Sequence, residues 1–254
     1  MLPRKRKLQA GARSIEYVLS GAGVPAVLLF SGAGVTLEGW DRLYPGIERI
    51  ARVLAWNRPG LGRSSLARRP QDSLAVLQDL RLLLDALALP PPYVLVGHSL
   101  GGLHAQLFAR RHPGETAGVV LLESLHADDR DGVKGHVKRL AGALARQLDV
   151  SAAGLATNIR EETERVEASA AQLAAAGSFP AVPLVVVTGA KAPPHWLVRE
   201  PALRRKRARQ RQLARLSPRG VRAPAKRSGH FPQLTQPMLV LDAIRSVVLQ
   251  ARAA

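Results

Sequence analysis

The stretch Val94-Leu95-Val96-Gly97-His98-Ser99-Leu100-Gly101-Gly102 decides the fold. An apolar run typical of a buried strand leads into the pattern Gly-x-Ser-x-Gly, and helical spacing of apolar residues follows. A serine nucleophile needs a turn this tight, because its hydroxyl must stand clear of the end of the strand. Gly97 and Gly101 have no Cβ, so strand and helix can pass close on either side of Ser99. The alternative interpretation is an ordinary glycine-rich turn between a strand and a helix.

Composition predicts a single large globular domain. The chain has 254 residues, 46% of them hydrophobic, and no cysteine, which excludes disulfides and thiolate sites. No apolar run approaches the ~20 residues that a membrane-spanning helix needs. The basic cluster Arg4-Lys5-Arg6-Lys7 is not followed by the apolar stretch of a secretory signal, so we expect a cytoplasmic protein.

The formal net charge is +18, and the positive charge is uneven. Residues 199–227 contain twelve Lys and Arg residues against one acid, Glu200. Such a run can meet an anionic partner, for example nucleic acid or an anionic membrane. We favour a solvated helix face and loop, because the run has no aromatic residues on which bases would stack.

Strands and helices are expected to alternate along most of the chain, which indicates an α/β fold with a mostly parallel, doubly wound sheet and helices on both faces. Residues 1–12 resemble a frayed basic arm. The core is expected to comprise 13–126 and 180–254, and the Ala-rich stretch 127–179 to be a helical cap or lid insertion. Strands are expected at 14–19, 24–30, 51–56, 94–96, 116–122, 182–188 and 221–225, and helices near 40–47 and at 73–87 (capped by Ser73), 100–112, 200–216 and 237–253.

Four stretches, in this order, resemble the α/β-hydrolase fold serine hydrolases of the carboxylesterase-like kind. They are Phe30-Ser31-Gly32-Ala33-Gly34, Asn57-Arg58-Pro59-Gly60-Leu61-Gly62-Arg63-Ser64, Gly97-His98-Ser99-Leu100-Gly101-Gly102 and Ser228-Gly229-His230-Phe231. Two positions depart from the family pattern, which often has His-Gly at Ser31-Gly32 and Asp at Asn57. The resemblance implies an α/β-hydrolase fold and a Ser-His-acid triad.

Ser99 is the expected nucleophile, and seven histidines compete for the role of its base. His230 is favoured, because it lies in a Gly-flanked loop after the last expected strand and follows the family's chain order. The side chain of His98 should point away from that of Ser99. Surface or core-edge positions are expected for His104 and His112, and loop or cap positions for His126, His136 and His195.

The triad acid is less clearly marked, since the loop after the strand at 182–188 contains no carboxylate. The resemblance favours Glu123, because some family members carry the acid at the end of the strand after the elbow helix. Its carboxylate would then orient the imidazole and stabilise the imidazolium. Asp128 and Asp129 are the next candidates, and Glu200 and Asp242 are further carboxylates. A strand-end residue paired with an arginine is the structural alternative for Glu123.

The resemblance also assigns the oxyanion donors to the backbone N–H groups of Ala33 and Leu100. No cofactor, metal or nucleotide is implied. The expected function is cleavage of a small carboxylic ester, lactone or related acyl substrate. Amide, thioester or carbon–carbon cleavage on the same fold is one alternative, and a non-catalytic binding module that uses residues 199–227 is another.

Overall fold

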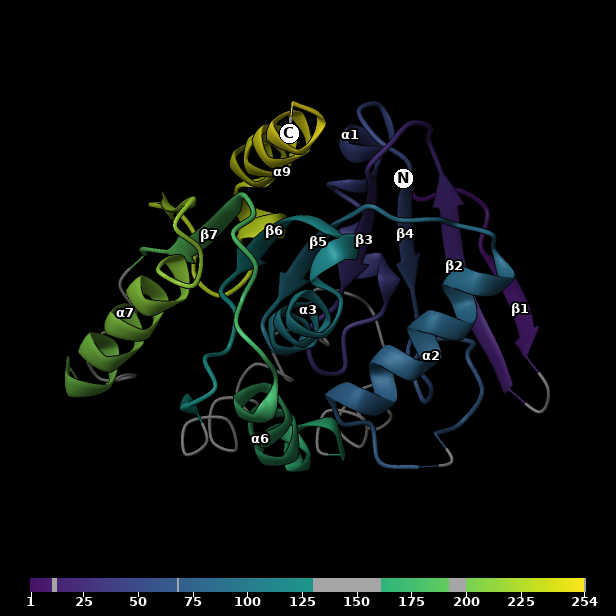
Figure 1. Ribbon diagram of the computed structural model, residues 1–254, viewed down its shortest axis with the longest axis horizontal. Helices are drawn as coiled ribbons and strands as arrows, with labels where there is room; N and C mark the ends of the chain where they lie inside the picture. Colours follow the sequence, from purple (N-terminus) through teal and green to yellow (C-terminus); the bar gives the residue numbers. More distant parts are fainter. Residues whose placement is uncertain (11–12, 68, 130–160, 192–199, 254) are drawn as a thin grey trace.

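A computed structural model describes residues 1–10, 13–67, 69–129, 161–191 and 200–253 (Figure 1). The strands are β1 Arg6–Ala10, β2 Arg13–Ser20, β3 Ala26–Phe30, β4 Val53–Trp56, β5 Tyr93–His98, β6 Thr116–Leu122, β7 Leu184–Gly189 and β8 Gly220–Ala225. They form one sheet in the order β1-β2-β4-β3-β5-β6-β7-β8. β1 and β2 pair antiparallel, as do β2 and β4, and all the other pairs are parallel.

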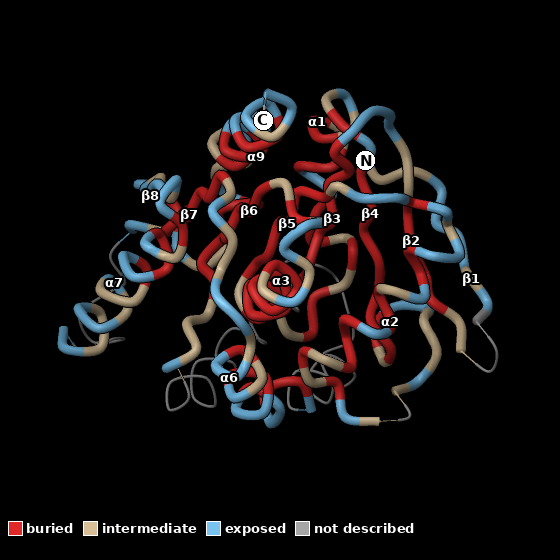
Figure 2. Tube along the Cα trace, viewed as in Figure 1, coloured by how far each residue is buried: buried red, intermediate tan, exposed pale blue. Residues whose placement is uncertain are grey.

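Helices cover both faces of this sheet. They are η1 Leu37–Trp40, α1 Tyr44–Glu48, α2 Ser73–Ala86, α3 Leu100–Arg111, η2 Pro113–Glu115, α6 Val166–Ala175, α7 Glu200–Ala214, α8 Pro232–Thr235 and α9 Pro237–Arg252. One core cluster packs α2, α3, α6 and the end of α7 against the sheet, and the other packs η1, α1 and α9. The central strands are buried on both sides, which explains their continuous apolar runs (Figure 2). The predicted fold class is confirmed.

The N-terminal segment differs from the expected basic arm. Residues 6–10 form β1, which pairs with β2 in the register Leu8 to Ile15. Leu8 packs against the apolar core cluster, although the cationic residues Arg6 and Lys7 precede it in the same edge strand. The expected arm is therefore replaced in part by a strand of the sheet.

The N-terminal cap of α2 differs from the expected one. Asp72, not Ser73, caps α2, because its side chain accepts a hydrogen bond of 2.9 Å from the Ala75 backbone N–H.

β8 is a strand although it contains Arg222 and Pro224. It lies at the edge of the sheet, where a missing N–H donor is tolerated.

The expected insertion at 127–179 is described only in part, since residues 130–160 lie outside the described ranges, and its boundaries remain a prediction. Residues 161–179 include α6, which is docked on the start of α2. The Ser73 backbone N–H donates to Ser169 Oγ at 3.0 Å, and that of Leu74 donates to Gln172 Oε1 at 3.0 Å. The described end of this segment is therefore fastened to the core.

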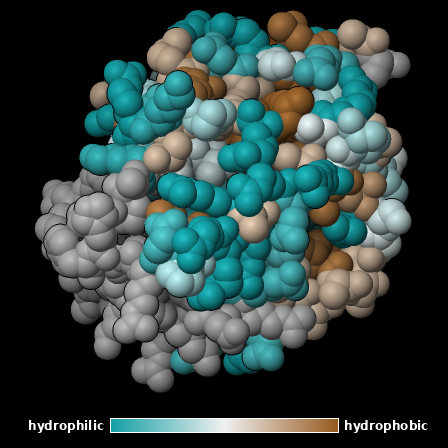
Figure 3. Space-filling model, turned by 90° about the vertical axis from the view of Figure 1, so that its left-hand side faces the viewer, coloured by the Kyte–Doolittle hydropathy of each residue, from teal (hydrophilic) through white to brown (hydrophobic). Residues whose placement is uncertain are grey.

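None of the helices within the described ranges has the length and apolar character needed to cross a membrane. The face formed by α7 is largely hydrophilic (Figure 3).

Candidate active site

Ser99 occupies the sharp turn between β5 and α3. Its backbone has φ 53° and ψ −118°, a conformation that costs about 1–3 kcal/mol for a residue other than glycine. The end of β6 and the loop that follows it hold Ser99 there, because the Ser99 N–H donates to Leu122 O at 3.0 Å and the Ser99 carbonyl accepts from Leu125 N–H at 3.1 Å. A Cβ on Gly101 would lie 2.1 Å from Phe30 O, so only glycine permits this close packing.

His230 lies in the loop between β8 and α8, and the fold brings it to Ser99. Its Nε2 is 3.1 Å from Ser99 Oγ, within hydrogen-bond reach. The loop is anchored on both sides, since Lys191 N–H donates to Ser228 O at 3.0 Å and His98 Nε2 lies 2.8 Å from His230 O. The imidazole is thus aimed at the serine by backbone and side-chain contacts.

Glu123 follows β6 directly, with φ 46° and a fully buried side chain. Its Oε2 lies 3.5 Å from His230 Nδ1, and its Oε1 accepts from Gly189 N–H at 2.8 Å. Lys206 Nζ, from α7, donates to the same Oε2. Burial alone would raise the pKa of Glu123, yet the hydrogen bond with His230 and the charge of Lys206 lower that pKa to about 2. The carboxylate is therefore ionised beside the imidazole.

The other candidate acids pair elsewhere. Asp128 Oδ2 lies 3.4 Å from His126 Nδ1, and Asp129 pairs with Arg209. The carboxylates of Glu200 and Asp242 lie 3.7 and 3.5 Å from Arg204 and Arg245, respectively. Of the five carboxylates considered from the sequence, the structure brings Glu123 to His230.

The loop Ser31–Gly34 lies beside the nucleophile. A Cβ built on Gly32 would be 3.3 Å from Ser99 Cβ, so the loop backbone passes close to the serine. Trp40 Nε1 donates to Ser31 Oγ at 2.8 Å and fixes the start of the loop. Ala33 lies in this loop, and Leu100 is the first residue of α3, where backbone N–H groups are not used within the helix.

A family model described as the alpha/beta hydrolase fold matches residues 25–215 of this chain. The chain belongs to the α/β-hydrolase fold family. A candidate lipase of Acinetobacter baumannii resembles this α/β-hydrolase with a TM-score of 0.78 and 19% identity, over 98% of this chain and 92% of that one. A thermophilic esterase of Thermogutta terrifontis has a TM-score of 0.67 and 20% identity, over 98% and 99% of the two chains. At such identities the two structures show the shared fold.

One curated relative of the α/β-hydrolase is a candidate carbamate hydrolase, RutD, of Variovorax paradoxus. It is 35% identical over 130 residues, which is 50% of this chain and 48% of that protein. The chain spans less than half the length of each of the first curated relatives that it matches. The match of the family model thus establishes the family.

Sequence reasoning missed two supporting side chains of this α/β-hydrolase. His98 is buried, and its ring centroid lies 5.0 Å from that of His230. Burial and the nearby His230 lower the pKa of His98 to about 3, so the ring is neutral at pH 7 and its Nε2–H can donate to His230 O. Its position in the elbow suggested a side chain turned away from Ser99, and gave no sign of a contact with the distant His230 loop.

Lys206 is the second missed residue, because the basic run was interpreted as a solvated face. A helical stripe was nevertheless present in the sequence: Lys206, Arg209, Gln210 and Leu213 follow the spacing i, i+3, i+4 and i+7. Gln210 Nε2 donates to Ser124 O at 2.7 Å, and Leu213 is fully buried. The inward stripe of α7 therefore docks on the segment that carries Glu123, while its other cations remain exposed.

The remaining histidines of the α/β-hydrolase lie elsewhere or are not described. His104, expected near the surface, is buried with Nδ1 2.8 Å from Ser73 Oγ, and burial and the charge of Arg58 hold its pKa well below the usual range. His112 and His126 are partly buried and face Glu115 and Asp128. His136 and His195 lie outside the described residues. Within the described residues, no three His, Asp or Glu side chains form a group suited to a metal ion.

Proposed function

We propose that this α/β-hydrolase is a serine hydrolase that cleaves small carboxylic esters, lactones or related acyl compounds. Ser99 is the nucleophile, His230 the base and Glu123 the acid that orients the base. One observation carries the proposal: His230 has Nε2 3.1 Å from Ser99 Oγ and Nδ1 3.5 Å from Glu123 Oε2. An imidazole held between a hydroxyl and an ionised carboxylate has the arrangement that activates a serine.

In the first half-reaction, Ser99 Oγ attacks the carbonyl carbon of the substrate while its proton passes to His230 Nε2. Glu123 keeps the Nδ1–H tautomer in place and stabilises the imidazolium, without taking the proton itself. The C–O bond to the leaving group then breaks, and His230 returns the proton to the departing oxygen. The product of this half-reaction is an acyl ester on Ser99.

The second half-reaction hydrolyses that ester. His230 Nε2 removes a proton from water as the water oxygen attacks the acyl carbon, and the proton then returns to Ser99 Oγ as the acid departs. In both halves the carbonyl oxygen becomes an oxyanion, for which the backbone N–H groups of Ala33 and Leu100 are the proposed donors. The positive end of α3 adds to this stabilisation.

The names of similar proteins support acyl chemistry, since a lipase, an esterase and a carbamate hydrolase all cleave bonds to a carbonyl carbon. The test uses a chromogenic ester panel and a matched pair of acid variants. Ser99→Ala should abolish turnover in a folded protein, and Glu123→Gln should reduce kcat by up to about 10⁴-fold, as neutralising a triad acid does. Asp128→Asn, the control, should leave kcat close to wild type. A larger loss in Asp128→Asn than in Glu123→Gln would move the acid to Asp128.

A further inference from the structure

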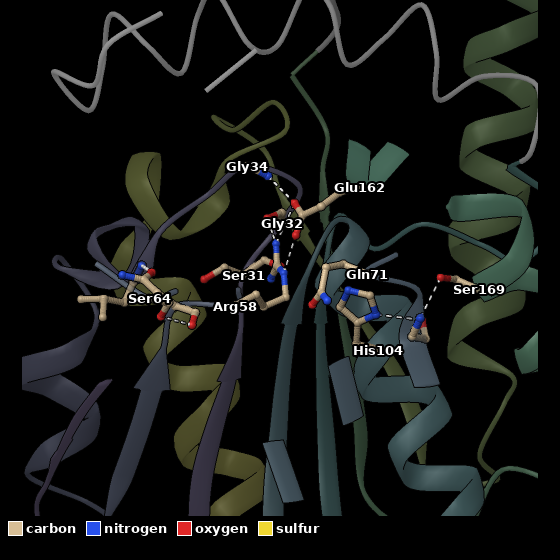
Figure 4. A network of polar contacts seen from close by, with 12 residues as sticks. Ser31, Gly32, Gly34, Arg58, Ser64, Gln71, His104, Glu162 and Ser169 are labelled. Atoms are coloured by element: carbon tan, nitrogen blue, oxygen red, sulfur yellow. Dashed lines mark hydrogen bonds and ion pairs between the residues drawn. The ribbon is translucent and has the colours of Figure 1, made fainter. Parts of the chain in front are cut away.

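Arg58 is a buried cation that holds the loop beside Ser99. Its side chain is 3% exposed, although it lies in the turn that follows β4. One guanidinium nitrogen donates to Ser31 O and another to Gly32 O, both at 2.8 Å (Figure 4). Arg58 therefore binds the backbone immediately before Ala33.

Glu162 binds both Arg58 and the same loop. Its carboxylate, 6% exposed, accepts from Arg58 Nε at 2.6 Å and from a terminal Arg58 nitrogen at 3.0 Å. The Gly34 backbone N–H donates to Glu162 Oε2 at 2.6 Å. The ion pair thus contacts the residues on both sides of Ala33, the proposed oxyanion donor (Figure 4).

Glu162 belongs to the segment that leads into α6, which is fastened to α2 by its contacts with Ser73 and Leu74. The pair therefore joins two parts of the chain that are 104 residues apart. A buried ion pair is weak evidence for stability, because desolvation offsets most of its Coulomb energy. The position of the pair matters for catalysis, because an oxyanion donor is effective only when it is already in place before the reaction.

We propose that Arg58 and Glu162 are positioning residues that set the Ala33 N–H for the oxyanion, so that the segment entering α6 takes part in controlling the reactivity of Ser99. This inference rests on the proposed function. It predicts that weakening the pair lowers binding of the transition state more than binding of the substrate.

The test compares Glu162→Gln and Arg58→Lys with a matched control, Asp79→Asn. Asp79 is also a buried carboxylate, 2% exposed and paired with Arg13 and Arg69, and its contacts lie away from the loop. The measurements are kcat and KM on a chromogenic acetate ester, the inhibition constant of a trifluoromethyl ketone that forms an oxyanion on serine, and the free energy of unfolding in urea.

For Glu162→Gln we expect kcat to fall roughly 10- to 100-fold, KM to change less than about twofold, and the inhibition constant to rise in step with the loss of kcat/KM. Arg58→Lys keeps the charge but has a single nitrogen in place of the two that donate to Ser31 O and Gly32 O, so it should show the same kinetic pattern. It provides the test if Glu162→Gln does not fold. Asp79→Asn should lower the free energy of unfolding and leave kcat and the inhibition constant unchanged.

An active wild-type enzyme whose folded Glu162→Gln and Arg58→Lys variants keep kcat and ketone binding would overturn this inference alone. Equal kinetic losses in Asp79→Asn would also overturn it, because the effect would then be general destabilisation. A folded wild-type protein without Ser99-dependent turnover or ketone binding would contradict the proposed function, and this inference with it.

Discussion

Lys206 and His230 approach the same oxygen of Glu123. Lys206 Nζ donates to Oε2, and His230 Nδ1 lies 3.5 Å from that atom. Lys206 is 39% exposed, whereas the carboxylate is fully buried, so a partly exposed cation of α7 pairs with a buried acid. A cation here stabilises the ionised form of Glu123.

Replacing Lys206 should therefore change the pH dependence of stability. Lys206→Met removes a charge that lowers the pKa of Glu123, so the ionised carboxylate should contribute less to the free energy of unfolding. In urea, Lys206→Met should be less stable than the wild type near pH 6, and the difference should shrink as the pH falls toward 2 and Glu123 becomes protonated. Arg207→Met, which removes an exposed cation from the same helix, is the control and should stay close to the wild type at both pH values. A difference for Lys206→Met that does not change with pH would contradict the role of Lys206 beside Glu123.

Glu123 should also make stability depend on acid. Its pKa is about 2 in the folded protein against an ordinary value of 4.5, so the folded state binds this proton less well than the unfolded state. The ionised form therefore contributes stability above about pH 4.5, on the order of 3 kcal/mol, which is lost as the pH falls toward 2. Urea unfolding of the wild type and Glu123→Gln should give a wide gap in free energy near pH 6 and a narrow one near pH 3. A gap that stays constant with pH would mean that Glu123 is not ionised in this way.

The elbow should not tolerate a methyl group at Gly101. A Cβ there would lie 2.1 Å from Phe30 O and 2.6 Å from Ser31 O, so the helix or the loop Ser31–Gly34 would have to move. Gly101→Ala should cost about 1–3 kcal/mol of unfolding free energy and slow ester turnover. Gly114→Ala is the control, because a Cβ at that position would meet no atom within 4 Å, and its effect should stay within about 0.5 kcal/mol. Unchanged turnover and stability in Gly101→Ala would show that the close packing is not required.

The fold was predictable because its central signals are local. The buried parallel strands appear as continuous apolar runs, and the strand–turn–helix sequence around Ser99 identifies the elbow directly. β1 was not predicted, because its sequence begins with Arg6 and Lys7 and only Leu8 was found to pack against the core. Pairing with β2 completes this edge strand, and the sequence alone does not show that pairing. The cap of α2 was predicted at the wrong residue, because Asp72 and Ser73 are equally good capping types. Only the backbone conformation shows which of the two is the N-cap residue.

Only part of the candidate site could be predicted from the sequence. Ser99 and His230 were singled out by motif and chain order, and Glu123 was favoured among several carboxylates. The contacts of Lys206, His98 and Glu162 join segments far apart in the chain, and periodicity carries no information about such pairs. Glu162 lies within the expected cap, a stretch whose sequence showed clustered charges but no partner for any one of them.

Whether Ser99 is an activated nucleophile is tested by covalent labelling of the intact protein with a fluorophosphonate, followed by peptide mass mapping. We predict a single adduct on Ser99, absent in Ser99→Ala and strongly reduced in folded His230→Ala, because the phosphonate reports an activated serine with an adjacent base. A folded wild-type protein that takes up no label, or takes it up elsewhere, would contradict the proposed serine hydrolase. The alternative would then be salt-dependent binding of an anionic partner through the exposed cations within residues 200–227.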